Sequence, residues 1–549
     1  MFDNVQYLHS QLPESVKLMG RLLVTNFKIL LGTPEDLEIL NLPLACILRT
    51  DLREGKEVEF VCKEILSFRL GFGEAQYEPF IHLVERIFPV HPNQLFVSAY
   101  YQACVGSSDI ELNTLVPESV TTNGWRVYNP LEEFERLQLE SHRWRVSSAN
   151  AAFELCPSYP KHLVVPNSLT DAELLSASQH RGQQRIPVLA WRHRNGSFLC
   201  HGAGLAIAQK SGEGSLLPSA DSKLLEAIMR NGCSANGNQL TPRGSSSRIA
   251  TPLTPKGSTK ASFSKRNPFR MHAKKTSDLS ALLQESDMCI LEFGESTQGL
   301  SDAFEAPGTL LYTREVVNID SLAEMQETYS RIQRLCTAPY SPETEENWLT
   351  QLEATRWISQ QQNLMQTALR VVEMVTRGTS ALLCYPESEF DRVCQVSSLA
   401  QLWMDPHYRT LAGFAKLIEK EWLSFGHSFS HRAGYLTREN HPEIAPVFIQ
   451  FLDGVWQSLQ QFPYAFQFTN KLLVELAAEY FSARYGTFSF NNDRERRAVF
   501  APSSTASFWT HVLLDPSYLS PLYVADWEAT LLPSADSRSL ALWTSYFLR

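Results

Sequence analysis

Short apolar runs separated by polar residues mark the chain between residues 16 and 104. The runs VKLMGRLLVTNFKILL, LACIL, VEFVC and ILSFRLGF are rich in Val, Ile, Leu and Phe, and the segment YEPFIHLVERIF after them has the periodicity of an amphipathic helix. Closely spaced strands followed by one such helix predict a small β-barrel or β-sandwich closed by a terminal helix. The polar stretch at residues 107–124 has no apolar periodicity, so we expect a linker between two domains there.

The second half of the chain has a different pattern. Residues 345–375 place apolar side chains at i, i+3, i+4 and i+7 over several turns, which predicts one long core helix. A strand-like run (380–385), a polar turn (386–392) and a helical run (393–404) then follow in that order. Loop amides and a helix N-terminus arranged this way can both face an anion, so the order is typical of an α/β phosphate site.

Composition and charge narrow the class of protein. With 549 residues, of which 44% are hydrophobic and 20% charged, the chain is expected to fold into two to four soluble domains. A formal net charge of −10 argues against non-specific nucleic-acid binding. The ten cysteines include no C-x-x-C pair and no His/Cys cluster at zinc-ligand spacing, so we expect no metal site and no cofactor. The N-terminal residues lack the pattern of a signal peptide, which predicts a cytoplasmic protein with at most peripheral membrane contact.

A basic insertion stands apart from this acidic background. Residues at about 230–278 are dominated by Ser, Thr, Gly, Asn and Pro, and they predict a disordered loop. The stretch between 231 and 277 contains nine Lys and Arg residues and no acid. It is either a solvated surface insertion or a basic patch for anionic lipid or an acidic partner. The candidate contact residues are Lys265, Arg266, Arg270, Lys274 and Lys275.

Seven segments carry a resemblance that runs in order over most of the chain. They are NGWRVYNPLEEFERL (123–137), HRWRVSSANAAFELCPSYPKHLVVP (142–166), RGQQRIPVLAWRH (181–193), NWLTQLEATRWI (347–358), LIEKEWLSFGHSFSHRAG (417–434), VFIQFLDGVWQSLQQFPYAFQFT (447–469) and RYGTFSFNN (484–492). Together they resemble the myotubularin family, lipid-phosphatase relatives of the protein tyrosine phosphatases. The resemblance implies an α+β PH-GRAM-like β-barrel with a closing helix at residues 1–106 and a linker at 107–124. It also implies an α/β protein-tyrosine-phosphatase-like domain with many helices at 125–549.

The same resemblance locates a degenerate phosphate loop. Active myotubularins remove the 3-phosphate from PI3P and PI(3,5)P2 with a loop that reads H-C-S-D-G-W-D-R-T. Its Cys thiolate attacks phosphorus, its first Asp protonates the leaving oxygen, and its Arg grips two phosphate oxygens. In this chain Pro386 takes the place of the Cys, Glu387 of the Ser, Ser388 of the acid Asp, Glu389 of the Gly and Phe390 of the Trp, whereas Asp391 and Arg392 are retained.

These replacements oppose catalysis. Proline offers no nucleophile and no N–H, and two new carboxylates repel a dianionic phosphate. Cys384 is predicted to lie in a core strand and Cys394 on the following helix, so neither replaces the missing thiolate. We expect Arg392 to close an internal salt bridge, and we expect His427 and His431 to pack or cap and not to bind a metal.

The sequence therefore predicts a pseudophosphatase. The favoured hypothesis is an adaptor or regulatory subunit that forms a hetero-oligomer with an active myotubularin-family phosphatase, cytoplasmic and peripheral on endosomal membranes. The alternative is a module that binds phosphoinositide membranes without an enzyme partner. A third hypothesis is that the protein is an active phosphatase, but this needs a nucleophile that the sequence does not supply.

Overall fold

The computed structural model describes most of the chain. The described residues are 1–9, 18–33, 39–87, 124–204, 219–232, 249–250, 288–294, 312–338, 346–385, 390–435, 441, 443–499, 501, 505–525, 527 and 529–548. The expected linker at 107–124, apart from Gly124, lies outside them.

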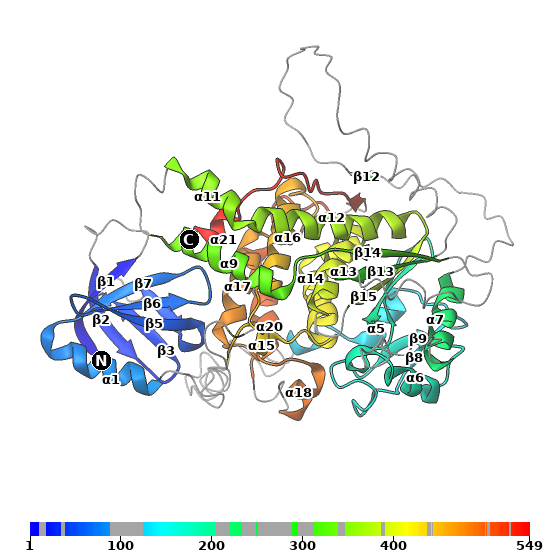
Figure 1. Cartoon of the computed structure of the whole chain (residues 1–549), viewed down its shortest axis with the longest axis horizontal. Helices are drawn as coiled ribbons and strands as arrows, with labels where there is room; N and C mark the ends of the chain where they lie inside the picture. Colours follow the sequence, from blue (N-terminus) through cyan, green and yellow to red (C-terminus); the bar gives the residue numbers. More distant parts are fainter. Residues whose placement is uncertain are drawn as a thin grey trace, which may run out of the picture.

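The N-terminal part is one antiparallel sheet followed by a helix, as the sequence predicts (Figure 1). Its seven strands lie in the order β4-β3-β2-β1-β7-β6-β5. They are β1 (Phe2–His9), β2 (Leu18–Val24), β3 (Lys28–Gly32), β4 (Leu40–Pro43), β5 (Ile47–Arg53), β6 (Glu57–Cys62) and β7 (Ser67–Gly71), and the helix is α1 (Glu74–Ile87). Alternate residues of β6 point inward, and Phe80 of α1 stacks on Phe72 with ring centroids 4.1 Å apart. Burial of these aromatic rings fixes the helix against the sheet.

Two details of this sheet differ from the sequence prediction. The run LACIL does not begin as a strand, because residues Leu44–Cys46 form a 3-10 turn before β5. The central strand β1 precedes the region in which strands were predicted, and it pairs with both β2 and β7. The N-terminal strand therefore joins the β2–β4 half of the sheet to the β5–β7 half.

The larger part is built on a second, five-stranded sheet in the order β10-β11-β15-β13-β14. Its strands are β10 (Val188–Arg192), β11 (Phe198–Ala203), β13 (Met288–Phe293), β14 (Tyr312–Val317) and β15 (Ser380–Tyr385). All but β10 run parallel, and β15 lies at the centre with all six residues buried. A strand that is buried on both faces of a parallel sheet has a continuous apolar sequence, and this explains the composition of the run SALLCY.

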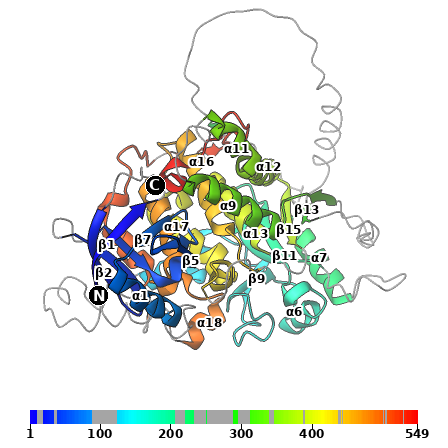
Figure 2. The same cartoon turned by 60° about the vertical axis from the view of Figure 1, so that its left-hand side comes forward.

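Helices and short hairpins surround this sheet (Figures 1 and 2). The shorter elements include β8 (Trp144–Ser147), β9 (Leu163–Pro166), η4 (Gly182–Gln184), η7 (Pro406–Arg409), η8 (Glu419–Ser424) and β16 (Thr530–Leu531). The main helices are α5 (Pro130–Arg136), α6 (Asp171–Ser178), α7 (Ser219–Gly232), α9 (Leu322–Thr337), α11 (Trp348–Thr355), α12 (Trp357–Thr376), α13 (Asp391–Met404), α14 (Leu411–Ile418), α15 (Phe429–Arg432), α16 (Val447–Gln461), α17 (Asn470–Ser482), α18 (Asp493–Ala498), α20 (Phe508–Leu514) and α21 (Thr544–Phe547).

The prediction of one continuous helix over residues 345–375 is wrong in one respect. The segment forms α11 and α12, and Arg356 between them has a φ of 67°, in the left-handed region. A left-handed residue ends one helix and redirects the chain into the next. Apolar periodicity continues across the break, so the sequence pattern does not reveal it.

The basic insertion is described in two short pieces. Residues 230–232 belong to the last turn of α7, and Ile249–Ala250 form β12, which pairs in parallel with β16. These five residues are therefore regular structure, contrary to the expectation of disorder throughout 230–278. Lys265, Arg266, Arg270, Lys274 and Lys275 lie outside the described residues.

Helix α9 joins the two parts of the molecule, and both cartoons show it beside the N-terminal sheet (Figures 1 and 2). The Gln333 amide donates hydrogen bonds to the carbonyls of Cys62 and Glu64, at 2.7 and 2.8 Å. In the opposite direction, the Lys63 ammonium donates to the Gly434 carbonyl at 2.7 Å. The N-terminal sheet is thus bonded directly to the larger part.

Candidate functional site

The strand β15 and the helix α13 lie on either side of the predicted turn, as the sequence predicts. The strand ends at Tyr385, and the helix begins at Asp391, two residues earlier than expected. Phe390 precedes the first turn, and every residue of α13 is buried. Pro386, Glu387, Ser388 and Glu389 lie outside the described residues, so the site is built from Phe390, Asp391, Arg392 and their surroundings.

The guanidinium of Arg392 is bound to protein oxygens. It is 1% exposed, and one nitrogen donates to the side-chain carbonyls of Gln395 at 2.9 Å and Gln450 at 3.1 Å. The other terminal nitrogen donates to the main-chain carbonyls of Asp320 and Ser321, which precede α9. These acceptors are neutral, and they hold the fork of donors that would grip a phosphate.

The buried ion pair at this corner belongs to Asp391. Its carboxylate accepts hydrogen bonds from Arg432 at 2.8 and 3.2 Å and lies 2.6 Å from Nδ1 of His427. Burial alone would raise the pKa of Asp391, but Arg432 and His427 hold it well below its ordinary value. The carboxylate is therefore ionised near neutral pH and cannot donate a proton.

An arginine that sequence reasoning did not single out fills the space beside Phe390. The guanidinium carbon of Arg185 lies 4.3 Å from the centre of the Phe390 ring and 4.4 Å from that of Tyr159. The same side chain donates to Ser158 Oγ at 2.8 Å and to the Phe425 carbonyl at 2.5 Å. Arg185 belongs to the RGQQRIP segment, but no local pattern in that segment predicts its contact with Phe390.

The two nearby cysteines are core residues, as predicted. Cys384 lies in the central strand β15, and burial raises the pKa of its thiol to about 12. Burial likewise raises the pKa of Cys394 on α13 well above its ordinary value. A reactive cysteine needs a lowered pKa, so neither thiol is suited to nucleophilic attack near neutral pH.

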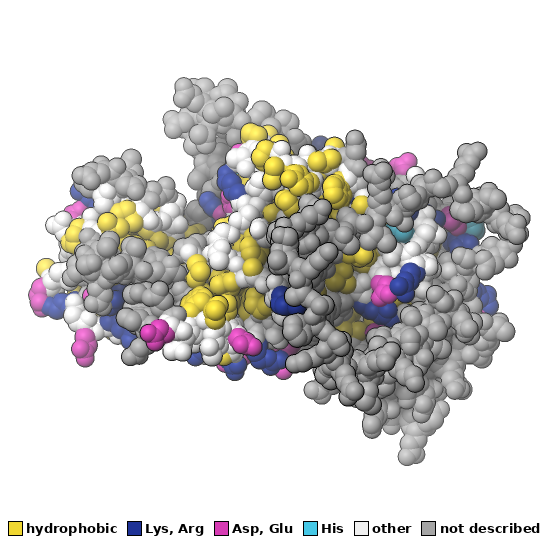
Figure 3. Space-filling model, turned by 90° about the horizontal axis from the view of Figure 1, so that it is seen from above, with side chains coloured by type: hydrophobic (Ala, Val, Ile, Leu, Met, Phe, Trp, Pro, Cys, Tyr) yellow, Lys and Arg dark blue, Asp and Glu magenta, His cyan; other side chains and the backbone are white. Residues whose placement is uncertain are grey.

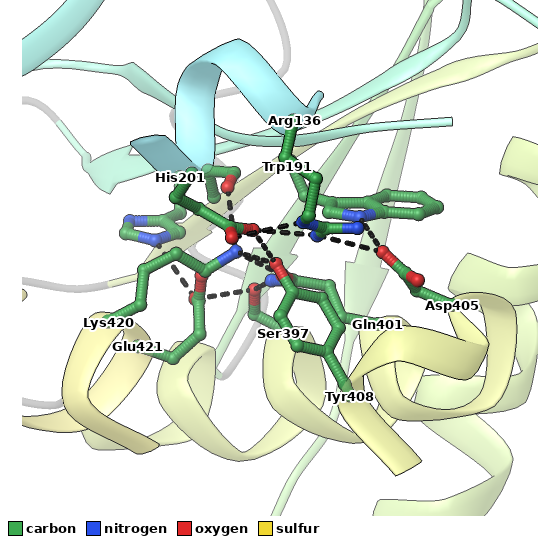
Figure 4. A network of polar contacts seen from close by, with 11 residues as sticks. Arg136, Trp191, His201, Ser397, Gln401, Asp405, Tyr408, Lys420 and Glu421 are labelled. Atoms are coloured by element: carbon green, nitrogen blue, oxygen red, sulfur yellow. Dashed lines mark hydrogen bonds and ion pairs between the residues drawn. The ribbon is translucent and has the colours of Figure 1, made fainter. Parts of the chain in front are cut away.

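A buried polar network holds α13 from its other side (Figure 4). The Lys420 ammonium donates to Gln401 Oε1 and to the Tyr408 hydroxyl, both at 2.6 Å. Gln401 in turn donates to Ser397 Oγ at 2.8 Å, and Ser397 donates to Glu421 at the same distance. Through these bonds α13 is tied to the π-helical turn η8.

The same network extends from Tyr408 to α5. Tyr408 donates to Glu133 at 2.5 Å, and Arg136 bridges Glu133 at 2.7 Å and Asp405 at 3.0 Å. Burial raises the pKa of Glu133, but Arg136 and Lys420 lower it to about 2. Paired buried charges of this kind fix a structure firmly when every member is satisfied. These protein groups connect α13 to η7 and α5.

The two histidines of the FGHSFSHRAG segment do not converge. His427 is buried against Asp391, and burial lowers its pKa. His431 is on the surface, with Nδ1 3.7 Å from Glu443. Within the described ranges, no group of three or more His, Cys, Asp or Glu residues is arranged to hold a metal ion. Among the same residues, no helix is long and apolar enough to cross a membrane.

Comparison with known proteins agrees with the sequence resemblance. A model of the myotubularin-like phosphatase domain matches residues 110–497. Myotubularin of Rattus norvegicus is 29% identical over 553 residues, with 98% of this chain and 81% of that protein covered. Myotubularin of Xenopus laevis is 28% identical, with 96% and 80% covered. The phosphatidylinositol-3,5-bisphosphate 3-phosphatase MTMR2 of Gallus gallus is 29% identical, with 98% and 85% covered. A family model that matches well over half of the chain, in the part that carries the β15 to α13 junction, shows that this protein belongs to the myotubularin family.

Proposed function

We propose that this protein is a catalytically inactive member of the myotubularin family that acts as an adaptor or regulatory subunit of an active family member. On this proposal the N-terminal antiparallel sheet with α1 is a PH-GRAM-like domain, and the larger part has a protein-tyrosine-phosphatase-like fold. The protein works in the cytoplasm, at the surface of endosomal membranes, and the active partner supplies the 3-phosphatase chemistry.

The engagement of Arg392 is the observation that carries the proposal. A phosphate would have to displace hydrogen bonds from two carbonyls and two side-chain amides before it could use this guanidinium. It would gain no nucleophile in return, because Pro386 occupies the position at which the resemblance places the thiolate. Ser388 does not serve as an acid near neutral pH. The site supports a structural role better than a catalytic one.

An exposed apolar surface favours a protein partner over a membrane alone. Hydrophobic side chains gather over the middle of the face that is uppermost in Figure 1 (Figure 3). Independently of that view, Tyr464, Leu519, Leu522 and Val524 are large apolar residues with 41 to 50% of their surface exposed. They come from two segments joined by hydrogen bonds, among them Val524 N–H to the Tyr464 carbonyl at 2.9 Å. Exposed apolar side chains on neighbouring segments are typical of protein interfaces.

Phosphatase assays and affinity purification test the two halves of the proposal. The purified protein should release no phosphate from PI3P or PI(3,5)P2, and an active myotubularin should co-elute with the tagged full chain from cells. Turnover that a Cys384→Ser substitution abolishes would overturn the inactive half. Binding to phosphoinositide vesicles with no co-eluting myotubularin would favour the membrane module instead.

A matched pair of surface variants sharpens the partner test. Leu522→Glu with Val524→Glu should reduce co-elution of the active partner, because the new charges cannot be buried in an interface. Leu52→Glu is the control, since Leu52 is a 61% exposed leucine on the N-terminal sheet. Equal loss in both variants would exclude the surface formed by Leu522 and Val524 as the partner site.

A further inference from the structure

A pocket of about 480 Å³ lies between the N-terminal sheet and α9, and it shares Arg432 with the ion pair of Asp391. Arg49 and Arg53 line it from β5, and Lys63 lines it from the bend after β6. Gln333 and Arg334 line it from α9, and Arg432 with residues 444–446 forms a third side. Its volume is in the range of sites that take a small molecule.

The lining of this interdomain pocket is predominantly basic. Its charged residues are Arg49, Arg53, Lys63, Arg334 and Arg432 against Glu59 and Glu327. Three of the arginines are paired with acids near the surface: Arg49 with Asp51 at 2.9 Å, Arg53 with Glu59, and Arg334 with Glu327 at 3.8 Å. Ion pairs in solvent contribute little stability, so these arginines can exchange their carboxylate partners for a ligand at small cost.

One of the cations that line the pocket is buried. Lys63 is 8% exposed, its ammonium donates to the Gly434 carbonyl, and it lies 5.8 Å from the centre of the Tyr435 ring. Burial lowers the pKa of Lys63 to about 8. An ammonium has three donors, so a bound anion could accept from this group and offset its desolvation.

We propose that the interdomain pocket binds a small anion carrying two or more phosphate groups, and that this ligand joins the N-terminal sheet to α9. Arg49, Arg53 and Lys63 on one side and Arg334 on the other match several separated anionic groups better than a single one. The polar side chains of Gln326, Ser330 and Gln333 between them suit hydroxyl groups on the same ligand. The inference goes beyond the adaptor function.

Both residues retained from the phosphate loop are attached to the walls of this pocket. Arg432 lines the pocket and pairs with Asp391 at 2.8 Å. Arg392 donates to the carbonyls of Asp320 and Ser321, directly before the helix whose later turns line the pocket. A ligand that draws on Arg432 or shifts α9 therefore acts on the first turn of α13. Occupancy of the pocket is communicated to the degenerate loop through these two contacts.

Calorimetric titration of the full chain with inositol hexakisphosphate tests the site. The triple variant Arg49→Gln, Arg53→Gln, Arg334→Gln should weaken binding by about tenfold or more, since roughly 1.4 kcal/mol corresponds to tenfold in affinity. The matched control is Arg230→Gln, Arg377→Gln, Arg538→Gln, which removes three arginines that are paired with surface acids outside the pocket. Absence of binding, or equal weakening in both triples, would overturn the proposal.

Vesicle sedimentation distinguishes the two sources of such phosphate groups. Phosphatidylcholine vesicles with and without PI(3,5)P2 are compared for the wild type and both triples. If only the Arg49→Gln, Arg53→Gln, Arg334→Gln variant loses binding to PI(3,5)P2 vesicles, the ligand of the pocket is a lipid headgroup. Binding of inositol hexakisphosphate without vesicle binding assigns it to a soluble anion.

Hydrogen exchange tests the connection to the loop. With inositol hexakisphosphate bound, amide exchange should change both in α9 and in the first turn of α13, and the pocket triple should lose both changes. A change confined to α9 and the N-terminal sheet would overturn the communication between pocket and loop.

Discussion

Two groups of arginines in this molecule use the same chemistry to different ends. At the start of α13, Arg392 and the Arg432 partner of Asp391 are buried and bound to protein oxygens. At the interdomain pocket, Arg49 and Arg53 keep 42% and 55% of their side chains exposed. The first group resembles the centre of a phosphate site in sequence, and the second does not.

From this difference we infer that the role of each arginine depends on the partners of its guanidinium group. A guanidinium desolvated among fixed acceptors is already satisfied, and removing a partner leaves an uncompensated charge. A guanidinium in solvent loses little when it changes partner. The retained Asp391 and Arg392 are therefore expected to act in stability, and the pocket arginines in binding.

The largest expected effect comes from breaking the buried pair. Asp391→Ala should lower the free energy of unfolding by about 3–5 kcal/mol, because Arg432 loses its counter-ion in a dry site and His427 loses its contact with the carboxylate. Denaturant unfolding of the full chain measures it. Asp536→Ala, which removes an exposed partner of Arg538, is the control and should leave the transition unchanged. A transition as little affected as the control would mean that Asp391 is not structural.

A second buried carboxylate, that of Asp453, gives the next largest effect. Its contribution to stability depends on pH in the opposite direction to that of Asp391. Asp453 on α16 accepts from Trp357 Nε1 at 2.6 Å and from Gln457 at 2.9 Å, and burial raises its pKa from 3.8 to about 7. The folded protein therefore prefers the protonated acid. The stability contributed by the protonated Asp453 is fully present below about pH 4 and is lost as the pH rises to about 7. Above that pH the unfolding free energy no longer changes through this group.

Asp453→Asn should remove this dependence. The difference in unfolding free energy between variant and wild type should move in favour of the variant by on the order of 3–4 kcal/mol between pH 4 and pH 8. Denaturant unfolding at a series of pH values measures the difference. Parallel curves for the two proteins would show that Asp453 does not titrate in this range. Asp391 differs because its partners include a cation, so its contribution is lost in acid.

Sequence patterns predicted the strands and the closing helix of the N-terminal part because alternate residues there face one core. SALLCY was predicted as a strand because it is apolar throughout. The break at Arg356 was missed, since one left-handed residue does not alter apolar periodicity. The partners of Arg392 were also missed, because Gln450 and Asp320 lie 58 and 72 positions away in the chain. The pocket could not be predicted either, since its cations come from separate elements and meet only in the fold.

A smaller effect is expected from the pocket arginines. The triple Arg49→Gln, Arg53→Gln, Arg334→Gln should leave the melting temperature of the ligand-free protein unchanged within error, because each charge is paired near the surface. Thermal unfolding in low and high salt measures it. A clear loss of stability would place these arginines with the buried group and weaken the contrast between the two regions.

The smallest expected effect is on catalysis. Pro386→Cys should give no turnover of PI3P, although it returns the nucleophile to the position that the resemblance assigns to it. The new thiol would have the acids Glu387 and Glu389 close to it in the sequence, would lack an acid at position 388, and would lack Arg392, which is bound to other oxygens. Restoring Asp at 388 and Gly at 389 as well supplies the acid and removes one of the two carboxylates, but Glu387 and the bound Arg392 remain. Comparison of phosphate release by the single and the triple variant therefore shows whether activity is limited by the missing catalytic groups or by the bound state of Arg392. Activity in the single variant would show that Arg392 readily leaves Gln395 and Gln450, and the contrast between the buried and the exposed arginines would then fail.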